Sequence, residues 1–253
     1  MNVWRLVLDG RYDFRSNMER DSAMLESVAA GRRPGVLRIY NWSEPAVTVG
    51  FHQRSFSPVD PCLTIPVLER PTGGGAVLHG DDITFSLSAP EAGVFSRDVM
   101  ESCRAVTEIF ACALRRCGLD ARMQGGNTAF SRVCFQRSSP VELCVGDAKI
   151  LGLAALRKKG FMLFQGVMPL TVDAGLSRRV FGDEADPNLK GIRDYAPGFS
   201  EDAFLESLMD AFASQADLLF SQGRENDGQE HHDDEGEVHL RRQEPGNKRF
   251  AEE

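Results

Sequence analysis

The sequence predicts an α+β domain, with a mixed or antiparallel sheet core flanked by helices. β-prone runs are grouped in the middle of the chain, and amphipathic stretches precede and follow them. Strand and helix patterns do not alternate regularly, so a doubly wound parallel sheet is not expected. The 253 residues are 42% hydrophobic and 26% charged, a globular composition that is long enough to bury a sizeable core.

The first helix is predicted over residues 17–31, because apolar side chains recur there at near-helical spacing and Gly31 is suited to end it. Strands follow at residues 36–42, 46–52, 63–70 and 82–88. The first two of these strands are expected to be joined across the turn residues Ser43, Glu44 and Pro45.

A second helix is predicted over residues 97–118, with Ser96 as its N-cap. Cys103 and Cys117 belong to this helix and are expected to pack rather than react. The residues expected on its buried side are Val99, Val106, Ile109, Phe110, Ala113 and Leu114.

A β-meander is predicted next, with strands at residues 141–145, 148–157 and 161–170. Residues 202–220 have the amphipathic spacing of a closing helix. The catalytic domain is therefore expected to span residues 1–220. Residues 221–253 contain ten acidic against five basic residues and few aliphatic ones, so they are expected to form a disordered acidic tail.

Composition also excludes several function classes. The net charge of −8 argues against nucleic-acid binding, and no apolar run is long enough for a membrane helix. Asp9 and Asp13 do not fit a signal peptide, which predicts a cytoplasmic protein. The six cysteines form no CxxC pair and no HExxH motif occurs, so no metal site is expected and the thiols are expected to be reduced.

The segment ERPTGGGAVLHGDDITFSLS, residues 69–88, is the first candidate site. Gly73, Gly74 and Gly75 indicate a backbone that bends or lies against another group, with Arg70 and His79 on its flanks. Asp81 stands where a phosphate-binding loop needs its lysine, which excludes a P-loop. An ordinary glycine-rich hairpin explains the segment equally well.

Cys134 is the candidate nucleophile. It lies in a polar segment between Arg132 and Arg137, and positive charge favours a thiolate. Lys149 in the next hairpin is placed to stabilise that thiolate and to polarise a bound carbonyl. A buried, inert Cys134 with Lys149 as a turn residue is the alternative.

Taken together, these segments resemble the biotin/lipoate protein ligase superfamily, and most closely the LipM-type octanoyltransferases of the lipoate-protein ligase A branch. RPTGGGAVLH followed by ITFS matches one sequence block of that family. CFQRSSPVELCVGDAKILGLAALRKKGFMLFQGVMPL matches a second block, and EPAVTVGFHQ matches the strand before the first. The resemblance covers residues 17–220, and it implies the fold of that catalytic domain.

The resemblance implies an acyltransferase without cofactor that acts in protein lipoylation. Cys134 would take an octanoyl group from octanoyl acyl carrier protein as a thioester, and Lys149 would lower the pKa of the thiol and hold the acyl carbonyl. The acceptor would be the lysine of a lipoyl domain, such as the glycine-cleavage H protein or the E2 subunit of a 2-oxoacid dehydrogenase. The residues implied to bind substrate are Arg70, Thr72, Gly73, Gly74, Gly75, His79 and Gly152, with the amides near Gly75 and Gly152 facing the oxyanion.

The chain departs from the family pattern at several pocket positions. GSAQ is replaced by GLAA at residues 152–155, and QHGS by FQGV at residues 164–167. Three alternatives therefore stay open: an ATP-dependent lipoate-protein ligase, a lipoyl-domain amidotransferase, and a degenerate homologue that binds without chemistry. For an acidic carrier protein, residues 157–159 and residues 178–179 are two candidate basic docking sites.

Overall fold

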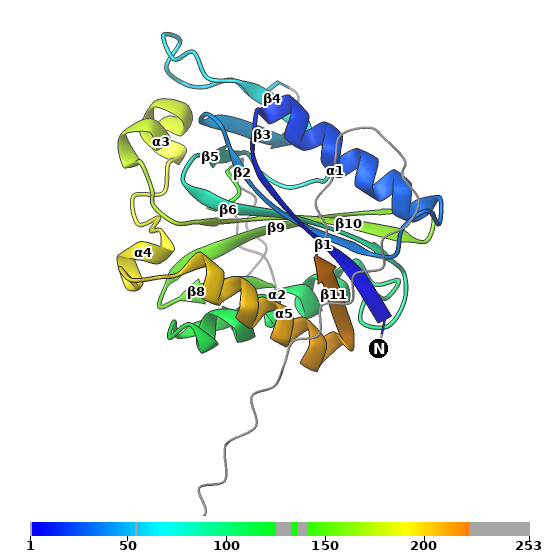
Figure 1. Ribbon diagram of the computed structural model, residues 1–253. Helices are drawn as coiled ribbons and strands as arrows, with labels where there is room; N and C mark the ends of the chain where they lie inside the picture. The colour runs from blue at the N-terminus through cyan, green and yellow to red at the C-terminus, as the bar shows by residue number, and fades with distance from the viewer. Residues whose placement is uncertain (1, 54, 125–132, 136–140, 223–253) are drawn as a thin grey trace, which may run out of the picture.

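The computed structural model describes residues 2–53, 55–124, 133–135 and 141–222. Its centre is an eight-stranded sheet with the order β11-β1-β2-β6-β10-β9-β8-β7, and a three-stranded sheet, β4-β3-β5, lies beside it (Figure 1). The predicted α+β class, a mixed sheet flanked by helices, is confirmed. Within these ranges no helix is long and apolar enough to span a membrane.

The large sheet is parallel at one side and antiparallel at the other. β1 runs parallel to β2 and β11, whereas each neighbouring pair from β2 to β7 is antiparallel. The predicted meander is present as β8, β9 and β10. The strands are β1 (Asn2–Tyr12), β2 (Val36–Trp42), β6 (Asp82–Pro90), β7 (Ala121–Gln124), β8 (Glu142–Val145), β9 (Ala148–Lys158), β10 (Phe161–Pro169) and β11 (Leu218–Gln222).

The small sheet contains β3 (Ala46–Gly50), β4 (Val67–Arg70) and β5 (Val77–His79). β3 lies in the middle, parallel to β4 and antiparallel to β5. The turn 43–45 therefore carries the chain from one sheet into the other and does not close a hairpin between β2 and β3. The glycine-rich segment between β4 and β5 crosses the end of β3.

The helices cover both faces of the large sheet (Figure 1). α1 (Phe14–Ala29) packs on one face, against β2, β6 and β10, while α2 (Val99–Arg116) and α5 (Glu201–Ala216) pack together on the other. α3 (Ala174–Phe181), a short 3₁₀ helix (Gly182–Glu184) and α4 (Ile192–Tyr195) connect β10 to α5. The predicted apolar side of α2 is buried, with Val99, Cys103 and Cys117 partly buried against the same core.

Several predictions of limits were wrong: α1 ends at Ala29 before Gly31, the strand predicted from residue 63 begins at Val67, and β1 was not predicted. Two further errors concern how helices begin and end. Asp98, not Ser96, caps α2, because its carboxylate accepts the backbone N–H groups of Met100 and Glu101. The closing helix ends at Ala216, where Asp217 adopts a left-handed conformation (φ 53°), and residues 218–220 form part of β11. β11 continues to Gln222, and the rest of the predicted tail, residues 223–253, lies outside the described residues.

Candidate active site

The glycine-rich loop lies against the end of β3. Gly74 has φ +97°, a conformation that side chains rarely adopt, and a Cβ added at Gly50 would lie 2.3 Å from the carbonyl oxygen of Gly74. The glycines therefore allow two backbone segments to touch. This close approach brings the loop next to Ala154 of β9, 3.8 Å from a Cβ built at Gly74.

Arg70 holds the loop in this shape. Its Nη2 donates hydrogen bonds to the carbonyl oxygens of Gly73 (2.6 Å) and Gly75 (2.8 Å), and its Nη1 donates to the carbonyl of Thr48 (3.1 Å). Burial lowers the pKa of the Arg70 guanidinium, while the nearby Cys134 thiol acts in the opposite direction. Arg70 thus organises the loop and places a cation near Cys134.

Cys134 is fixed to the residue that follows the glycines. Val133 bridges Ala76, and the N–H of Cys134 donates to the carbonyl of Ala76 over 2.9 Å. A Cβ built at Gly152 of β9 would lie 3.3 Å from the Cys134 sulfur. Cys134 is buried, with 8% of its surface exposed. Its thiol lies against β9 at Gly152, which has no side chain.

Lys149 also reaches Cys134, but at its backbone. The Lys149 ammonium donates to the Cys134 carbonyl oxygen (2.9 Å) and lies 2.7 Å from the Glu142 carboxylate. Lys149 is on β9 and Glu142 is on the neighbouring strand β8, so the meander places the pair. Both backbone polar groups of Cys134 are therefore bonded, its N–H to Ala76 and its carbonyl to Lys149.

A narrow slot of about 30 Å³ lies behind the thiol. Arg70, His79, Cys134 and Gly152 line it, together with the larger side chains Met18, Tyr40, Trp42 and Gln165. His79 is buried between the carboxylate of Asp82 (3.3 Å) and the hydroxyl of Thr48 (2.9 Å), and its ring stacks on Trp42 with centroids 4.1 Å apart.

A buried polar network supports the slot. The Thr72 hydroxyl donates to Gln165 Oε1 (2.9 Å), and Gln165 Nε2 donates to Asp21 (2.7 Å). Asp21 also forms an ion pair with Arg38 (2.8 Å) and accepts the Tyr40 hydroxyl (2.9 Å). Burial, with the Asp21 carboxylate close by, raises the pKa of Tyr40 well above its ordinary value. The network links the glycine loop to α1.

A wider cleft of about 250 Å³ lies on the other side of Cys134. Its polar lining includes Cys134, Glu142 and Lys149, while the three glycines form one edge. The rest of the wall is mainly apolar and comes from the start of α2 and from β9: Val99, Met100, Cys103, Leu151, Leu153, Ala154 and Ala155.

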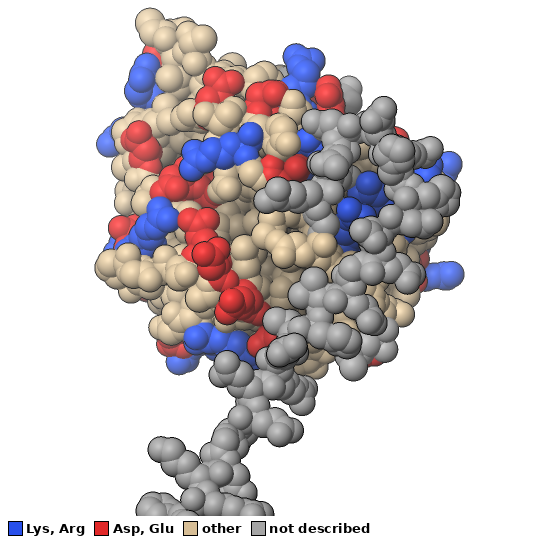
Figure 2. All heavy atoms as spheres, viewed as in Figure 1, with Lys and Arg blue, Asp and Glu red and all other residues tan. Residues whose placement is uncertain are grey.

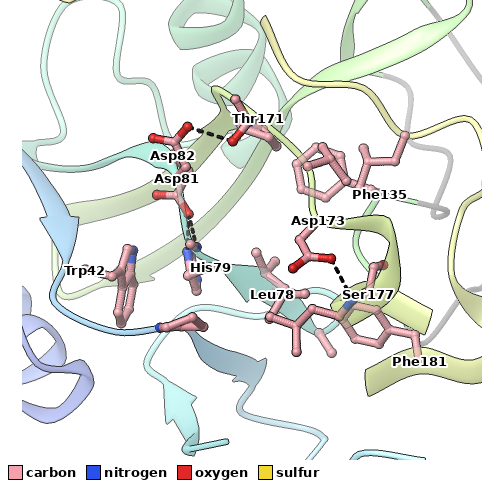
Figure 3. A pocket seen from close by; sticks show the side chains of 18 of the residues that line it. Trp42, Leu78, His79, Asp81, Asp82, Phe135, Thr171, Asp173, Ser177 and Phe181 are labelled. Carbon is pink, nitrogen blue, oxygen red and sulfur yellow. Dashed lines mark hydrogen bonds and ion pairs between the residues drawn. The ribbon is translucent and has the colours of Figure 1, made fainter. Parts of the chain in front are cut away.

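A third cavity, of about 320 Å³, shares Trp42, Val77 and His79 with the slot. Figure 3 shows the His79 and Trp42 rings on one side of it and Phe135 on the other. Its rim carries several carboxylates, most of which have partners: besides Asp82, Asp81 accepts the Thr171 hydroxyl (2.7 Å), Asp173 caps α3 and Asp186 accepts the N–H of Asn188.

The structure brings most of the sequence-predicted site residues together. Arg70, His79 and Gly152 line the slot, the three glycines and Lys149 line the cleft, and Cys134 lines both. Thr72 lines none of these cavities, and its hydroxyl instead donates to the side chain of Gln165.

Two residues of the predicted site, Arg132 and Arg137, lie outside the described residues. No metal-binding group of His, Cys, Asp and Glu occurs among the residues that are described.

Three residues of the candidate site were not predicted from the sequence. Glu142 pairs with Lys149, Gln165 lines the slot, and Asp21 anchors the network. Asp21 lies three residues after Met18 and seven before Val28, at the spacing of the buried stripe of α1. A polar residue in an apolar stripe, or in an apolar strand such as β10 for Gln165, is the signal that identifies such positions.

Comparisons with known proteins identify the family and the fold. The family described as "Lipoyl protein ligase A/B catalytic domain" matches residues 13–213. The chain is 34% identical over 187 residues to octanoyltransferase LipM of Exiguobacterium sibiricum, an alignment covering 68% of this chain and 67% of that protein. It is 35% identical over 185 residues to octanoyltransferase LipM of Exiguobacterium sp. strain ATCC BAA-1283, with coverage of 68% and 67%. The crystal structure of lipoate-protein ligase A bound with ATP has the same fold, with a TM-score of 0.71, 23% identity and 90% of each chain covered.

Proposed function

The chain belongs to the lipoyl protein ligase A/B catalytic-domain family, and from this premise we propose that it is a protein N-octanoyltransferase of lipoate biosynthesis. The observation that carries the proposal is the position of Cys134. Its thiol lies where a narrow slot meets an open cleft, close to the cation of Arg70, and its backbone is held by Lys149.

In the first half-reaction, the Cys134 thiolate attacks the carbonyl carbon of an octanoyl thioester on acyl carrier protein. A new carbon–sulfur bond forms at Cys134, the carbon–sulfur bond to the carrier breaks, and the carrier leaves as a thiolate that takes up a proton from solvent. The guanidinium of Arg70 is the cation near the sulfur, whereas Lys149 holds Cys134 through its backbone carbonyl and pairs with Glu142. The backbone amides near Gly75 and Gly152 are our candidates for the oxyanion donors.

In the second half-reaction, the neutral amine of a lipoyl-domain lysine attacks the Cys134 thioester. An amide forms, the carbon–sulfur bond breaks, and Cys134 returns to its thiol form. The acceptors that we propose are lipoyl domains such as those of the H protein and of E2 subunits. No ATP is needed, because the thioester already carries the free energy for amide formation.

We assign the acyl chain to the slot because its wall combines buried aromatic and aliphatic side chains with the bare backbone of Gly152; at about 30 Å³ the slot must widen to admit an eight-carbon chain. A linear alkyl chain needs a narrow channel. The hydrogen bond from Gln165 to Asp21 fixes the orientation of the Gln165 amide in the wall of the slot. The predicted division into a catalytic domain, residues 1–220, and a tail, residues 221–253, is kept in this proposal with the boundary moved past Gln222, where β11 ends.

Intact-protein mass spectrometry after mixing with octanoyl acyl carrier protein tests the proposal. We expect a thioester adduct on the wild-type protein that hydroxylamine removes and that a Cys134→Ala variant lacks. A Cys103→Ala variant is the matched control, since this second thiol lines the same cleft. Lys149→Met should slow adduct formation about 100-fold if Lys149 stabilises the reacting charge.

Two outcomes would overturn the proposal. An adduct that persists in Cys134→Ala would remove the nucleophile, and octanoylation of the lipoyl domain only from free octanoate with ATP would indicate a ligase. Transfer only from another octanoylated lipoyl domain would reassign the donor and make the protein an amidotransferase.

A further inference from the structure

The cleft extends from Cys134 along β9 toward one end of the large sheet. Leu151 and Ala155 mark its course on that strand, and β9 ends at Lys158, three residues or roughly 10 Å beyond Ala155. The opposite wall is the first turns of α2, with Val99 and Cys103. The loop before α2 and the turn after β9 therefore flank the same end of the cleft.

Four basic residues gather at this end, which we call the cationic end: Arg97, Arg157, Lys158 and Lys159. The strand register brings them together, because Lys158 pairs with Phe161 of β10 and Phe161 pairs with Pro90, directly before Glu91. Glu91 forms an ion pair with Arg157 and lies 4.0 Å from Arg97, which is 90% exposed. The nearby Asp98 is engaged as the cap of α2.

All four cations are exposed, and two of them are not engaged by Glu91. Lys158 and Lys159 form the tip of the β9–β10 turn, and among the described residues neither has an ion-pair partner. Arg32, in the loop before β2, adds a further exposed cation to this end, since β2 begins opposite Ser88 near the end of β6. The local charge is thus positive although the whole chain carries −8.

Other surfaces have the opposite character. Figure 2 shows acidic side chains along α5 on the face viewed there, where the sequence provides Glu201, Asp202, Glu206 and Asp210. Arg178 and Arg179 of α3 are the other basic pair, but Arg179 is bonded to Asp60 and the cavity next to α3 has carboxylates on its rim. A strongly acidic partner is therefore repelled from these regions and attracted to the cationic end.

We propose that the carrier protein of the acyl donor docks by an acidic surface on the cationic end, and that its thioester arm lies along the cleft and reaches Cys134 from there. This inference rests on the proposed transferase function and specifies how the donor is recognised. The cleft suits such an arm, because its apolar wall accommodates methyl and methylene groups while the glycine loop presents backbone for the amides of the arm.

The test is the apparent KM of thioester formation for octanoyl acyl carrier protein, measured with a Lys158→Glu/Lys159→Glu variant. We expect a rise of about tenfold at low ionic strength, and a smaller rise at high salt, because exposed charges mainly govern encounter. With octanoyl-pantetheine, a donor without a protein, the rate should stay within about twofold of wild type, since only the docking surface has changed.

An Arg178→Glu/Lys190→Glu variant is the matched control, because it makes the same change of net charge at exposed residues elsewhere. Its apparent KM for the carrier should remain near the wild-type value. An unchanged KM in the Lys158→Glu/Lys159→Glu variant, or an equal rise in the control, would overturn the docking inference. Failure of wild-type Cys134 to accept octanoyl groups from either donor would instead overturn the proposed function.

Discussion

The slot and the cleft meet at Cys134, and their walls are stabilised in different ways. Behind the thiol, the polar groups of Thr72, Gln165 and Asp21 are joined in one buried hydrogen-bonded chain that spans three elements. In front of it, the wall is made mainly of apolar side chains such as Leu153 and Ala155, which are partly exposed. Directional bonds fix the shape of the slot, whereas contacts without direction leave the cleft able to adjust.

The slot and the cleft also contain the positions at which this chain departs from the family blocks. Leu153 and Ala155 stand where those blocks have polar residues, and both line the cleft. Gln165 replaces the histidine of the second block and is fully integrated in the slot network. The apolar replacements therefore affect both cavities, because Leu153 lines the slot as well as the cleft and Val167 lines the slot, while Gln165 keeps satisfied polar groups there.

The largest expected effect concerns the network. Asp21→Asn removes a charge that is fully buried opposite Arg38, so we expect the free energy of unfolding to fall by about 3 kcal/mol, as for other broken buried ion pairs. Urea denaturation measures this change. Asp202→Asn, at an exposed position, is the control and should cost less than about 1 kcal/mol. Equal losses in both variants would show that the slot is not specially dependent on its network.

An intermediate effect is expected where slot and cleft meet. Gly152→Ala would place a methyl group about 3.3 Å from the Cys134 sulfur and also 3.3 Å from Val167. We expect thioester formation to slow about tenfold through misplacement of the thiol, with little loss of stability. Gly198→Ala, where an added Cβ meets nothing within 4 Å, is the matched control. An unchanged acylation rate in Gly152→Ala would show that the thiol tolerates crowding on its slot side.

The smallest effect concerns the second thiol of the cleft. Burial raises the pKa of Cys103 to about 11, so this thiol stays protonated near neutral pH. Its alkylation by iodoacetamide, followed by peptide mass spectrometry, should be slow at pH 8 and should rise as the pH approaches 11. Cys103→Ala should leave thioester formation within roughly twofold of wild type. Rapid alkylation of Cys103 at pH 8 would mean that the α2 wall opens further than the structure shows.

Local sequence patterns predicted much of the fold. The limits of β2 match the prediction, the meander strands were predicted to within one residue at each end, and five of the six residues expected on the buried side of α2 are fully buried, Val99 being partly buried. The errors have physical reasons. The N-cap of α2 depends on which of two nearby side chains, Ser96 or Asp98, reaches the free N–H groups, and α5 ends where Asp217 adopts a left-handed backbone.

The candidate site was predicted in outline. Cys134, Lys149 and the three glycines were identified from two separate segments, and the structure places them around one cleft. The bond from Lys149 to the Cys134 carbonyl, the ion pair with Glu142, and the role of Asp21 were not predicted. These contacts join residues that are far apart in the chain, or they depend on the direction in which a side chain points. Local residue spacing encodes neither the long-range neighbours nor the side-chain directions.

By itself, the sequence determined most of the elements and the residue types on which the proposed chemistry depends. Glycine content sets where the backbone can bend, apolar periodicity sets which faces are buried, and a thiol and an amine are the groups that the proposed reaction uses. Only the tertiary structure determined which cavities reach the Cys134 thiol. A slot, a cleft and the charge at its end form from side chains on different strands and helices, because cavities arise from packing between elements whose register is fixed only in the folded chain.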